Sequence, residues 1–366
     1  MSQAAAQPPR TPRANSNGPR AYASNASVAQ IIERLRSGSL VAAVTHSRPD
    51  GDAVGSTLAL ARALEKAGTK AVCAYLPPWP PRMDRVVAGS KIIHASPASW
   101  VEPPLSRADR VAVVDTGSWA QLTEARAWLE SRRAGAVIID HHEHGDAEIA
   151  DLRLIDTSAS AASALVAELC RVMLKLRSCA QLPVDIAEPL YLGIATDTGW
   201  FRYSNTTAST MRLAADLIDA GVDHNALYRH VEQNETPARL RLIERALASL
   251  ELLDSGRAAM ITLTREDIGA AGAGQDELGG LSDFPQSIGT VRVVAIVTEL
   301  EPRLTKVSLR SKAPEAGERV IDVNQIARSL GGGGHVHAAG AKVHAPLAEA
   351  RAQVAQALCR AVTGAA

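Results

Sequence analysis

Acidic and imidazole side chains follow the apolar runs of this sequence in a pattern suited to metal chemistry. They occur where three predicted strands end, and once more within the segment GIATDTG: His46, Asp50 and Asp52; Asp115; Asp140, His141 and His142; and Asp197. In open α/β sheets, ligands bind beyond the carboxyl ends of the strands, so these groups can converge although they are far apart in sequence. The pattern predicts a polar site at one edge of a sheet.

Each of these residues also has an ordinary structural explanation. A single aspartate at the end of a strand commonly caps a helix or a turn, and Pro49-Asp50-Gly51 is a favourable turn sequence by itself. A turn, however, requires neither His46 before it nor a second aspartate, Asp52, two residues later. The combination of signals favours the functional interpretation.

The residue types indicate which metal such a site would hold. Carboxylate oxygen and neutral imidazole are ligands of Mn²⁺ or a similar divalent ion, and the four cysteines show no C-x-x-C spacing that would suggest structural zinc. Four carboxylates carry four negative charges, which two divalent cations would neutralise: Asp50, Asp52, Asp115 and Asp197. Two such ions activate a bridging water and stabilise an in-line displacement at phosphorus. We expect a two-metal centre with Mn²⁺, for which Mg²⁺ or Co²⁺ would substitute.

The elements that would position these residues alternate between short apolar runs and helical patterns. LVAAVT from Leu40, AVCAYL, VAVVD at 111–115 and AVIID at 136–140 are continuous apolar runs, typical of strands that are covered on both faces in a parallel sheet. A helical pattern at 53–67 ends at Gly68, and further helical patterns lead from Asp140 to Gly221. We therefore expect an α/β fold whose larger N-terminal domain has a parallel sheet covered by helices.

The remainder of the chain predicts a second, smaller α/β domain. A long helical pattern at 224–252 resembles a connector, and the strand patterns AAMITLT, TVRVVAIVTEL and LTKVSLRSK follow it, with helical patterns in DVNQIARSL and EARAQVAQALCRAV. A chain of 366 residues with 46% apolar content is large enough to form two hydrophobic cores. The predicted division is a disordered tail at 1–26, a catalytic domain at 27–222, a helical linker at 223–255 and the smaller domain at 256–366.

Composition limits the partners and the compartment. Lys+Arg and Asp+Glu are both 39, so there is no global basic field of the kind that long duplex nucleic acid requires. The sequence has no run of about 18 apolar residues and no signal peptide, and its cysteines lie in apolar or helical stretches typical of reduced thiols. We expect a cytoplasmic protein without membrane contact that acts on short single-stranded RNA or DNA or on a small nucleotide, with a homodimer as an open alternative.

Taken together, the motifs resemble those of the DHH phosphoesterase family. HSRPDGDAVGS at 46–56, VVDTG at 113–117, IDHH at 139–142 and ATDTG at 195–199 stand in the family's order. SLRSK at 308–312 and GGGGHVHAAG at 331–340 resemble its DHH-associated C-terminal domain. The likeness within the family is to bacterial nanoRNases that also dephosphorylate 3'-phosphoadenosine 5'-phosphate. It implies hydrolysis of that compound and release of mononucleotides from the ends of short oligoribonucleotides.

The resemblance also implies roles for individual residues. The implied metal ligands form two sets that share Asp115 as a bridge: His46, Asp50 and Asp115 for one ion, and Asp52, Asp115, His141 and Asp197 for the other. Asp140 would orient an imidazole from outside the metal shell, and His142 would contact the substrate phosphate or the leaving oxygen.

The glycine loop at 331–334 has two interpretations. Four glycines can form a flexible hinge, or, after a helix and before His335, their N–H groups can form an anion-binding nest. No Lys-Ser or Lys-Thr follows, so the loop is not a Walker A loop. The resemblance implies a substrate-phosphate clamp in a cleft between the two domains, with these contacts: Arg310, Gly332, Gly333, Gly334 and His335. The planar guanidinium of Arg310 suits phosphate better than a lysine does.

Two other functions are alternatives to the one that the resemblance implies. A phosphodiesterase acting on cyclic di-AMP or its linear product pApA would share all the catalytic groups. A nucleotide-binding regulator without turnover would be expected to lack some of the metal ligands, and all six are present.

Overall fold

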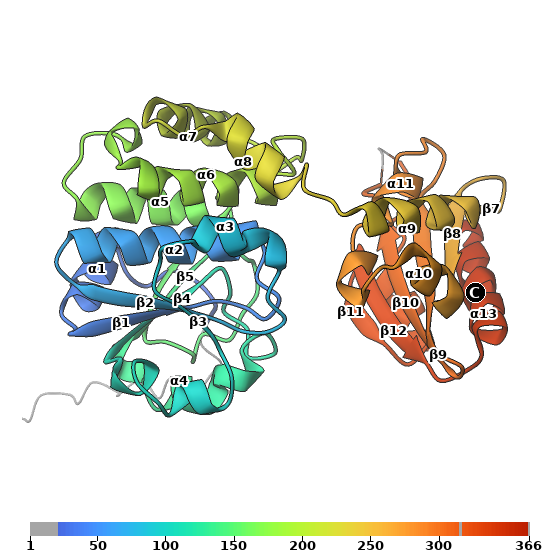
Figure 1. Cartoon of the computed structure of the whole chain (residues 1–366), viewed down its shortest axis with the longest axis horizontal. Helices are drawn as coiled ribbons and strands as arrows, with labels where there is room; N and C mark the ends of the chain where they lie inside the picture. The colour runs from blue at the N-terminus through green and yellow to red at the C-terminus, as the bar shows by residue number, and fades with distance from the viewer. Residues whose placement is uncertain (1–20, 315–316, 365–366) are drawn as a thin grey trace, which may run out of the picture. The chain divides into compact units, whose positions relative to one another are not determined.

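The chain forms two compact α/β units, which the computed structural model describes for residues 21–314 and 317–364 (Figure 1). The division falls between Gln233 and Asn234. The predicted fold class is confirmed, with a parallel sheet in the first unit and a separate sheet in the second. Among the helices of the described residues, none combines the length and the apolar character that crossing a membrane requires.

The sheet of the first unit has six parallel strands in the order β3-β2-β1-β4-β5-β6. Their bounds are Leu40–Val44 (β1), Lys70–Tyr75 (β2), Ile92–His94 (β3), Arg110–Val114 (β4), Ala136–Asp140 (β5) and Leu152–Ile155 (β6). The chain builds β2 and β3 on one side of β1 and then returns to build β4, β5 and β6 on the other side. Strand order therefore reverses between β1 and β4, and such a switch point is where open α/β sheets bind ligands.

Helices and turns cover this sheet on both faces, which explains why its strands are apolar throughout. Val41 and Ala43 of β1 face one core, while Ala42 and Val44 face the other. The first face packs against α1 (Val28–Arg36), α2 (Gly51–Lys66), α5 (Ala162–Met173) and α6 (Val184–Asp197), and the second lies near α4 (Arg126–Glu130) (Figure 1). The remaining helices of the unit are α3 (Asp84–Val87), α7 (Ala208–Asp219) and α8 (His224–Val231).

Glycines let α2 and α6 approach each other closely. A Cβ on Gly55 would clash with the backbone oxygen of Pro189, and a Cβ on Gly51 would clash with the side chain of Thr196. Close packing of these two helices places Asp52, in the first turn of α2, near Asp197 at the end of α6.

The second unit is built on a mixed sheet with the order β11-β12-β10-β9-β8-β7. Its strands are β7 (Glu251–Leu253), β8 (Ala258–Leu263), β9 (Val293–Glu301), β10 (Leu304–Ser311), β11 (Gly333–His335) and β12 (Ala338–Val343). Strands β8 and β9 pair in parallel, and the other neighbours in this strand order pair antiparallel. Two helices, α12 (Val323–Ser329) and α13 (Leu347–Thr363), pack on one face, while α9 (Pro237–Ala248) and α10 (Arg265–Ala271) pack on the other, and α11 spans Asp283–Gln286.

Two segments differ from the predicted domain division. The expected linker at 223–255 contains two helices rather than one, with α8 in the first unit and α9 and β7 in the second. The break has a local cause, because Thr236 is extended and caps α9, and Pro237 occupies the first position of that helix, both of which mark the start of a new helix. Of the expected tail, residues 1–20 lie outside the described residues, whereas residues 21–26 make hydrogen bonds to β6 and are ordered.

Candidate metal centre

Six side chains predicted as metal ligands lie together at the carboxyl end of the first unit's sheet. They supply ligand atoms within 4.8 Å of one another in two sets, His46 with Asp50 and Asp115, and Asp52 with His141 and Asp197. His46 follows β1 and Asp115 follows β4, so both lie at the switch point of the sheet. Each set combines carboxylate and imidazole, which is the donor chemistry that Mn²⁺ and similar divalent cations take.

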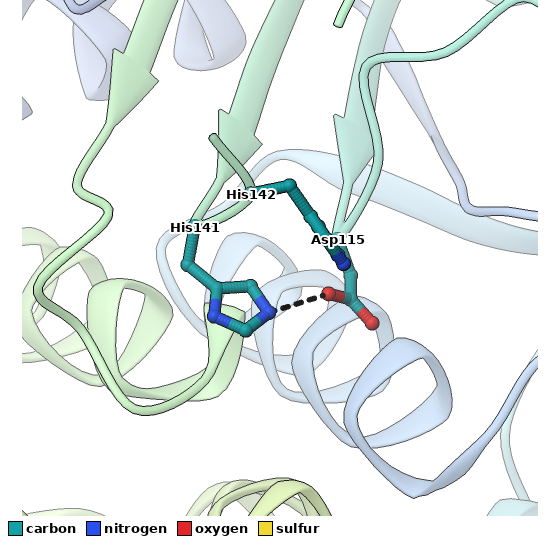
Figure 2. A group of neighbouring side chains, drawn as sticks. All are labelled: Asp115, His141 and His142. Atoms are coloured by element: carbon teal, nitrogen blue, oxygen red, sulfur yellow. Dashed lines mark ion pairs between the residues drawn. The ribbon is translucent and has the colours of Figure 1, made fainter. Parts of the chain in front are cut away.

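Asp115 lies between the two sets. One carboxylate oxygen is 3.5 Å from Nε2 of His46, and the other is 3.3 Å from Nε2 of His141. Figure 2 shows the His141 ring directed at Asp115 across the ends of two neighbouring strands. The backbone of Asp115 has φ 61, a left-handed conformation that aspartate and asparagine tolerate better than most residues. This conformation at a buried acid is a local strain of the kind that gathers at functional sites.

Asp50 and Asp52 are held by helix N-termini. Asp50 is the N-cap of α2, and one of its oxygens accepts hydrogen bonds from the N–H groups of Asp52 and Ala53. The structural and the functional interpretations of this residue are therefore compatible. Asp52 is buried, and its two oxygens accept hydrogen bonds from the backbone N–H groups of Ala162 and Ser163, at 2.6 and 2.9 Å. The positive end of the α5 dipole thus fixes this carboxylate.

Asp197 lies in the opposite electrostatic position. It is the last residue of α6, at the negative end of the helix dipole. Burial, with the neighbouring Asp115 and Asp50, raises the pKa of Asp197 to about 6, although His141 acts in the other direction. A negative side chain at this place is favourable only when a cation lies beside it.

The pKa values of three other groups in this cluster, Asp52, His46 and His141, are also raised. Burial raises the pKa of Asp52, and the charges of Asp115 and Asp197 raise it further. Burial acts against protonation of His46, yet its hydrogen bond to Asp115 and the nearby carboxylates raise its pKa to about 9. Burial likewise opposes protonation of His141, but Asp115, Asp52 and Asp197 raise its pKa to about 10. Without metal, protons on the imidazoles balance the carboxylates, and divalent cations would take their place. The residues therefore fit a metal centre.

Asp140 and His142 form a second layer beside this centre. Asp140 is fully buried, and its Oδ1 accepts hydrogen bonds from Nδ1 of His142 at 2.8 Å and from the backbone N–H of His141 at 2.8 Å. The hydrogen bond to Asp140 raises the pKa of His142, whose side chain is 55% exposed and so is open to a substrate. His142 also lies near Asp115 and His141, within reach of the same cation.

Tyr22 belongs to this layer and was not predicted from the sequence. Its hydroxyl donates a hydrogen bond to Oδ2 of Asp140. Burial and the adjacent carboxylate raise the pKa of the phenol, so the hydroxyl keeps its proton. Tyr22 stands in the segment that composition assigned to a disordered tail, and no motif marks it. Only its being an aromatic residue near the end of an Ala- and Pro-rich stretch hints at an anchor.

In the second unit, the glycine loop is part of a hairpin. The N–H groups of Gly331 and Gly332 bond to carbonyls of α12, and Gly333–His335 form β11, which pairs with β12. The expected run of free N–H groups is therefore interrupted. A Cβ on Gly332 or Gly334 would clash with the backbone of β12, so close strand approach requires these glycines.

Arg310 and His335 lie in one row of this sheet. Ala338 of β12 pairs with Arg310 of β10 on one side and with His335 of β11 on the other. Residues that pair directly across strands project to the same face, so the two side chains flank a small alanine. Both Arg310 and His335 are exposed.

Comparisons with known proteins agree with this architecture. A family model described as the DHH family, N-terminal domain, matches residues 40–194, and one described as the DHHA1 domain matches residues 259–364. The bifunctional oligoribonuclease and PAP phosphatase NrnA of Thermus thermophilus is 30% identical over 328 residues, which cover 89% of this chain and 90% of that protein. A probable protein of the same description from Streptococcus mutans is 28% identical over 317 residues, covering 85% and 92%.

A solved structure shows the same fold. The crystal structure of an exopolyphosphatase-related protein from Bacteroides fragilis matches with a TM-score of 0.81 at 23% identity, over 90% of this chain and 95% of that one.

Proposed function

Because the chain belongs to the DHH family, we propose that it is a metal-dependent phosphoesterase that hydrolyses short oligoribonucleotides and 3'-phosphoadenosine 5'-phosphate. The observation that carries this proposal is the position of Asp115, whose two oxygens face His46 and His141 from two separate ligand sets. One carboxylate shared between two sets is the arrangement expected of a two-metal phosphoesterase.

The proposed roles follow from the geometry. His46, Asp50 and Asp115 would hold one Mn²⁺, and Asp52, Asp115, His141 and Asp197 would hold the other. Bound there, the ions would supply an activated water and neutralise charge on the phosphate oxygens. Asp115 links the two ligand sets, and the α5 N-terminus fixes the carboxylate of Asp52. Asp140 accepts a hydrogen bond from Nδ1 of His142, which leaves Nε2 of that ring for the substrate. A proton on Nε2 would pass to the leaving oxygen as the ester bond breaks.

The substrates proposed are short and single-stranded. Lys+Arg and Asp+Glu are equal at 39, so affinity has to come from a few contacts rather than from a long basic surface. We place the protein in the cytoplasm, since three of its cysteines are buried free thiols. A homodimer is compatible with this proposal but is not required by it.

A product time course tests the proposal directly. The metal-stripped protein would be supplied with Mn²⁺ and given RNA of two to five nucleotides, 3'-phosphoadenosine 5'-phosphate, or cyclic di-AMP in parallel. We expect mononucleotides from the RNA and inorganic phosphate from the second substrate, with no product before Mn²⁺ is added. Turnover of cyclic di-AMP alone would favour the alternative phosphodiesterase, and nucleotide binding without any product would indicate a regulator.

We also propose that Arg310 and His335 bind a substrate phosphate. The two side chains stand on either side of Ala338, about 10 Å apart at the backbone from two strand spacings. A guanidinium and an imidazole at that separation can hold one phosphate from two sides.

Replacing Arg310 tests this assignment. Arg310→Ala should raise KM for 3'-phosphoadenosine 5'-phosphate about tenfold, because a hydrogen bond to a charged group contributes about 1.5 kcal/mol or more. The change in kcat should be smaller. Arg303→Ala is the matched control, since Arg303 is an exposed arginine on the turn between β9 and β10 and should leave KM unchanged. Equal KM values for the two variants would contradict the role of Arg310.

A further inference from the structure

Residues 21–26, here called the N-terminal segment, lie along β6 and form hydrogen bonds with it. This strand is the last of its sheet, so its outer edge would otherwise present unpaired backbone groups. Ser24 Oγ donates to the carbonyl of Ile155 at 2.8 Å and accepts from its N–H at 2.6 Å. Asn25 accepts from the N–H of Arg153 at 2.7 Å and donates to the carbonyl of Asp151 at 2.8 Å. These contacts join residues that are more than 120 positions apart in the sequence, and they fix the path of the N-terminal segment.

The same contacts position Tyr22 beside Asp140 and His142, the layer next to the metal centre. Its ring packs against the core beside Gly117 of VVDTG and Gly145, and a Cβ on either glycine would clash with it. The two glycines thus shape a slot for one aromatic ring. The hydroxyl at the end of that ring reaches Oδ2 of Asp140.

Asp140 divides its two oxygens between Tyr22 and the histidines. Oδ1 accepts from Nδ1 of His142 and from the backbone of His141, while Oδ2 accepts from Tyr22. Since Asp140 is fully buried, an oxygen without a donor would be costly, and the carboxylate would turn to find one. Turning would take Oδ1 away from His142.

We propose that Tyr22 is a positioning residue for phosphoester hydrolysis, which acts by locking Asp140 and, through it, the ring of His142. The inference rests on the proposed function, because it assumes that His142 acts on the substrate. It differs from that function in assigning a catalytic consequence to the N-terminal segment, which contributes no metal ligand.

Two substitutions in the full-length chain separate the hydroxyl from the ring. Tyr22→Phe keeps the ring in its slot and removes only the hydrogen bond, and Tyr22→Ala removes both. Tyr75→Phe is the control, since Tyr75 is a buried tyrosine whose hydroxyl also has a side-chain partner, Thr57 at 3.0 Å, and it lies outside the metal centre.

We expect Tyr22→Phe to lower kcat about tenfold, the effect typical of groups that orient residues at a metal site. KM and the Mn²⁺ concentration for half-maximal activity should stay within about twofold of the wild-type values, and the melting temperature should fall no more than that of Tyr75→Phe. A purely structural role would instead be rescued by phenylalanine. Wild-type kcat in Tyr22→Phe would therefore overturn the proposal.

The ring of His142 gives a readout that does not depend on turnover. In ¹⁵N-histidine spectra, with the signal assigned by His142→Gln, the Nδ1 resonance of His142 should move in Tyr22→Phe and stay in place in Tyr75→Phe. An unmoved resonance would overturn the proposal even if wild-type protein hydrolysed none of the substrates. In that case the proposed function would fail separately, on the wild-type time course.

Discussion

Asp115→Asn is expected to lower Mn²⁺-dependent hydrolysis by roughly a thousandfold, since losing about 4 kcal/mol of transition-state stabilisation corresponds to that factor. Asp115 is 3% exposed and offers one oxygen to each ligand set. An amide presents one oxygen and one NH₂ group, so it can serve one set but repels a cation in the other. The loss should appear in kcat for RNA and for 3'-phosphoadenosine 5'-phosphate alike.

The fold should tolerate this substitution. Asparagine adopts the left-handed backbone conformation found at Asp115, with φ 61, as readily as aspartate does. Asp109→Asn is the matched control, because Asp109 precedes the same strand at its other end, and its carboxylate accepts hydrogen bonds from the N–H groups of Ser39 and Leu40 and from the hydroxyl of Ser39. Asp109→Asn should hydrolyse both substrates at the wild-type rate. If Asp115→Asn kept a tenth of the wild-type rate, Asp115 would not be the shared ligand.

The sequence indicated that the six proposed ligands would lie close together, because several of them follow apolar strand runs, although each residue alone has an ordinary structural explanation. Asp115 and His141 come directly after apolar strand runs, and the carboxyl ends of parallel strands always meet at one edge of the sheet. The sequence did not reveal the strand order. That β1 and β4 are neighbours, which brings His46 within 3.5 Å of Asp115, depends on how the chain returns after β3.

Contacts made by backbone groups were beyond sequence reasoning. Asp52 is held by the N-terminus of α5, more than 100 residues later, and the donors are the main-chain N–H groups of Ala162 and Ser163. Any residue other than proline supplies such a donor, so no side-chain pattern marks it. Likewise, the glycines at 331–334 were compatible with a flexible hinge or an anion-binding loop, whereas in the structure β12 passes so close to Gly332 and Gly334 that a larger residue would clash there.

Tyr22 shows the limit of composition as a guide to order. Ala, Pro, Ser and Asn dominate the first 26 residues, and such composition predicts disorder because little apolar surface can be buried. Six residues at the end of that stretch are nevertheless ordered, by hydrogen bonds to one exposed strand edge and by one aromatic ring. A few specific contacts outweigh an average taken over the whole stretch.

Asp197→Asn is expected to lower hydrolysis about a hundredfold or more and, at the same time, to stabilise the metal-free protein. The folded-state pKa of Asp197 is raised from 3.8 to about 6, so folding favours its neutral form. The stability linked to that form is complete below pH 3.8 and is lost as pH rises through about 6. At pH 8 the charged carboxylate therefore opposes folding, and the neutral amide removes this cost.

The gain should be modest and should depend on pH and on metal. The rise of the pKa from 3.8 to about 6, discounted because the side chain is 28% exposed, corresponds to about 1 to 2 kcal/mol, or about 3 to 6 °C in the melting temperature of a unit of this size. Thermal melts in EDTA should show Asp197→Asn above wild type at pH 8, with a smaller difference at pH 5. Saturating Mn²⁺ should reverse the order, because wild type gains more from the ion.

Asp185→Asn separates this effect from any general effect of removing an acid from α6. Asp185 lies in the first turn of the same helix and forms an ion pair with Lys66 at 3.2 Å, so its charge is favourable where that of Asp197 is not. Asp185→Asn should be slightly less stable than wild type and fully active. If metal-free Asp197→Asn melted below wild type at pH 8, the charged Asp197 would stabilise the fold without metal. The proposal that the α6 C-terminus binds a cation would then lose its support.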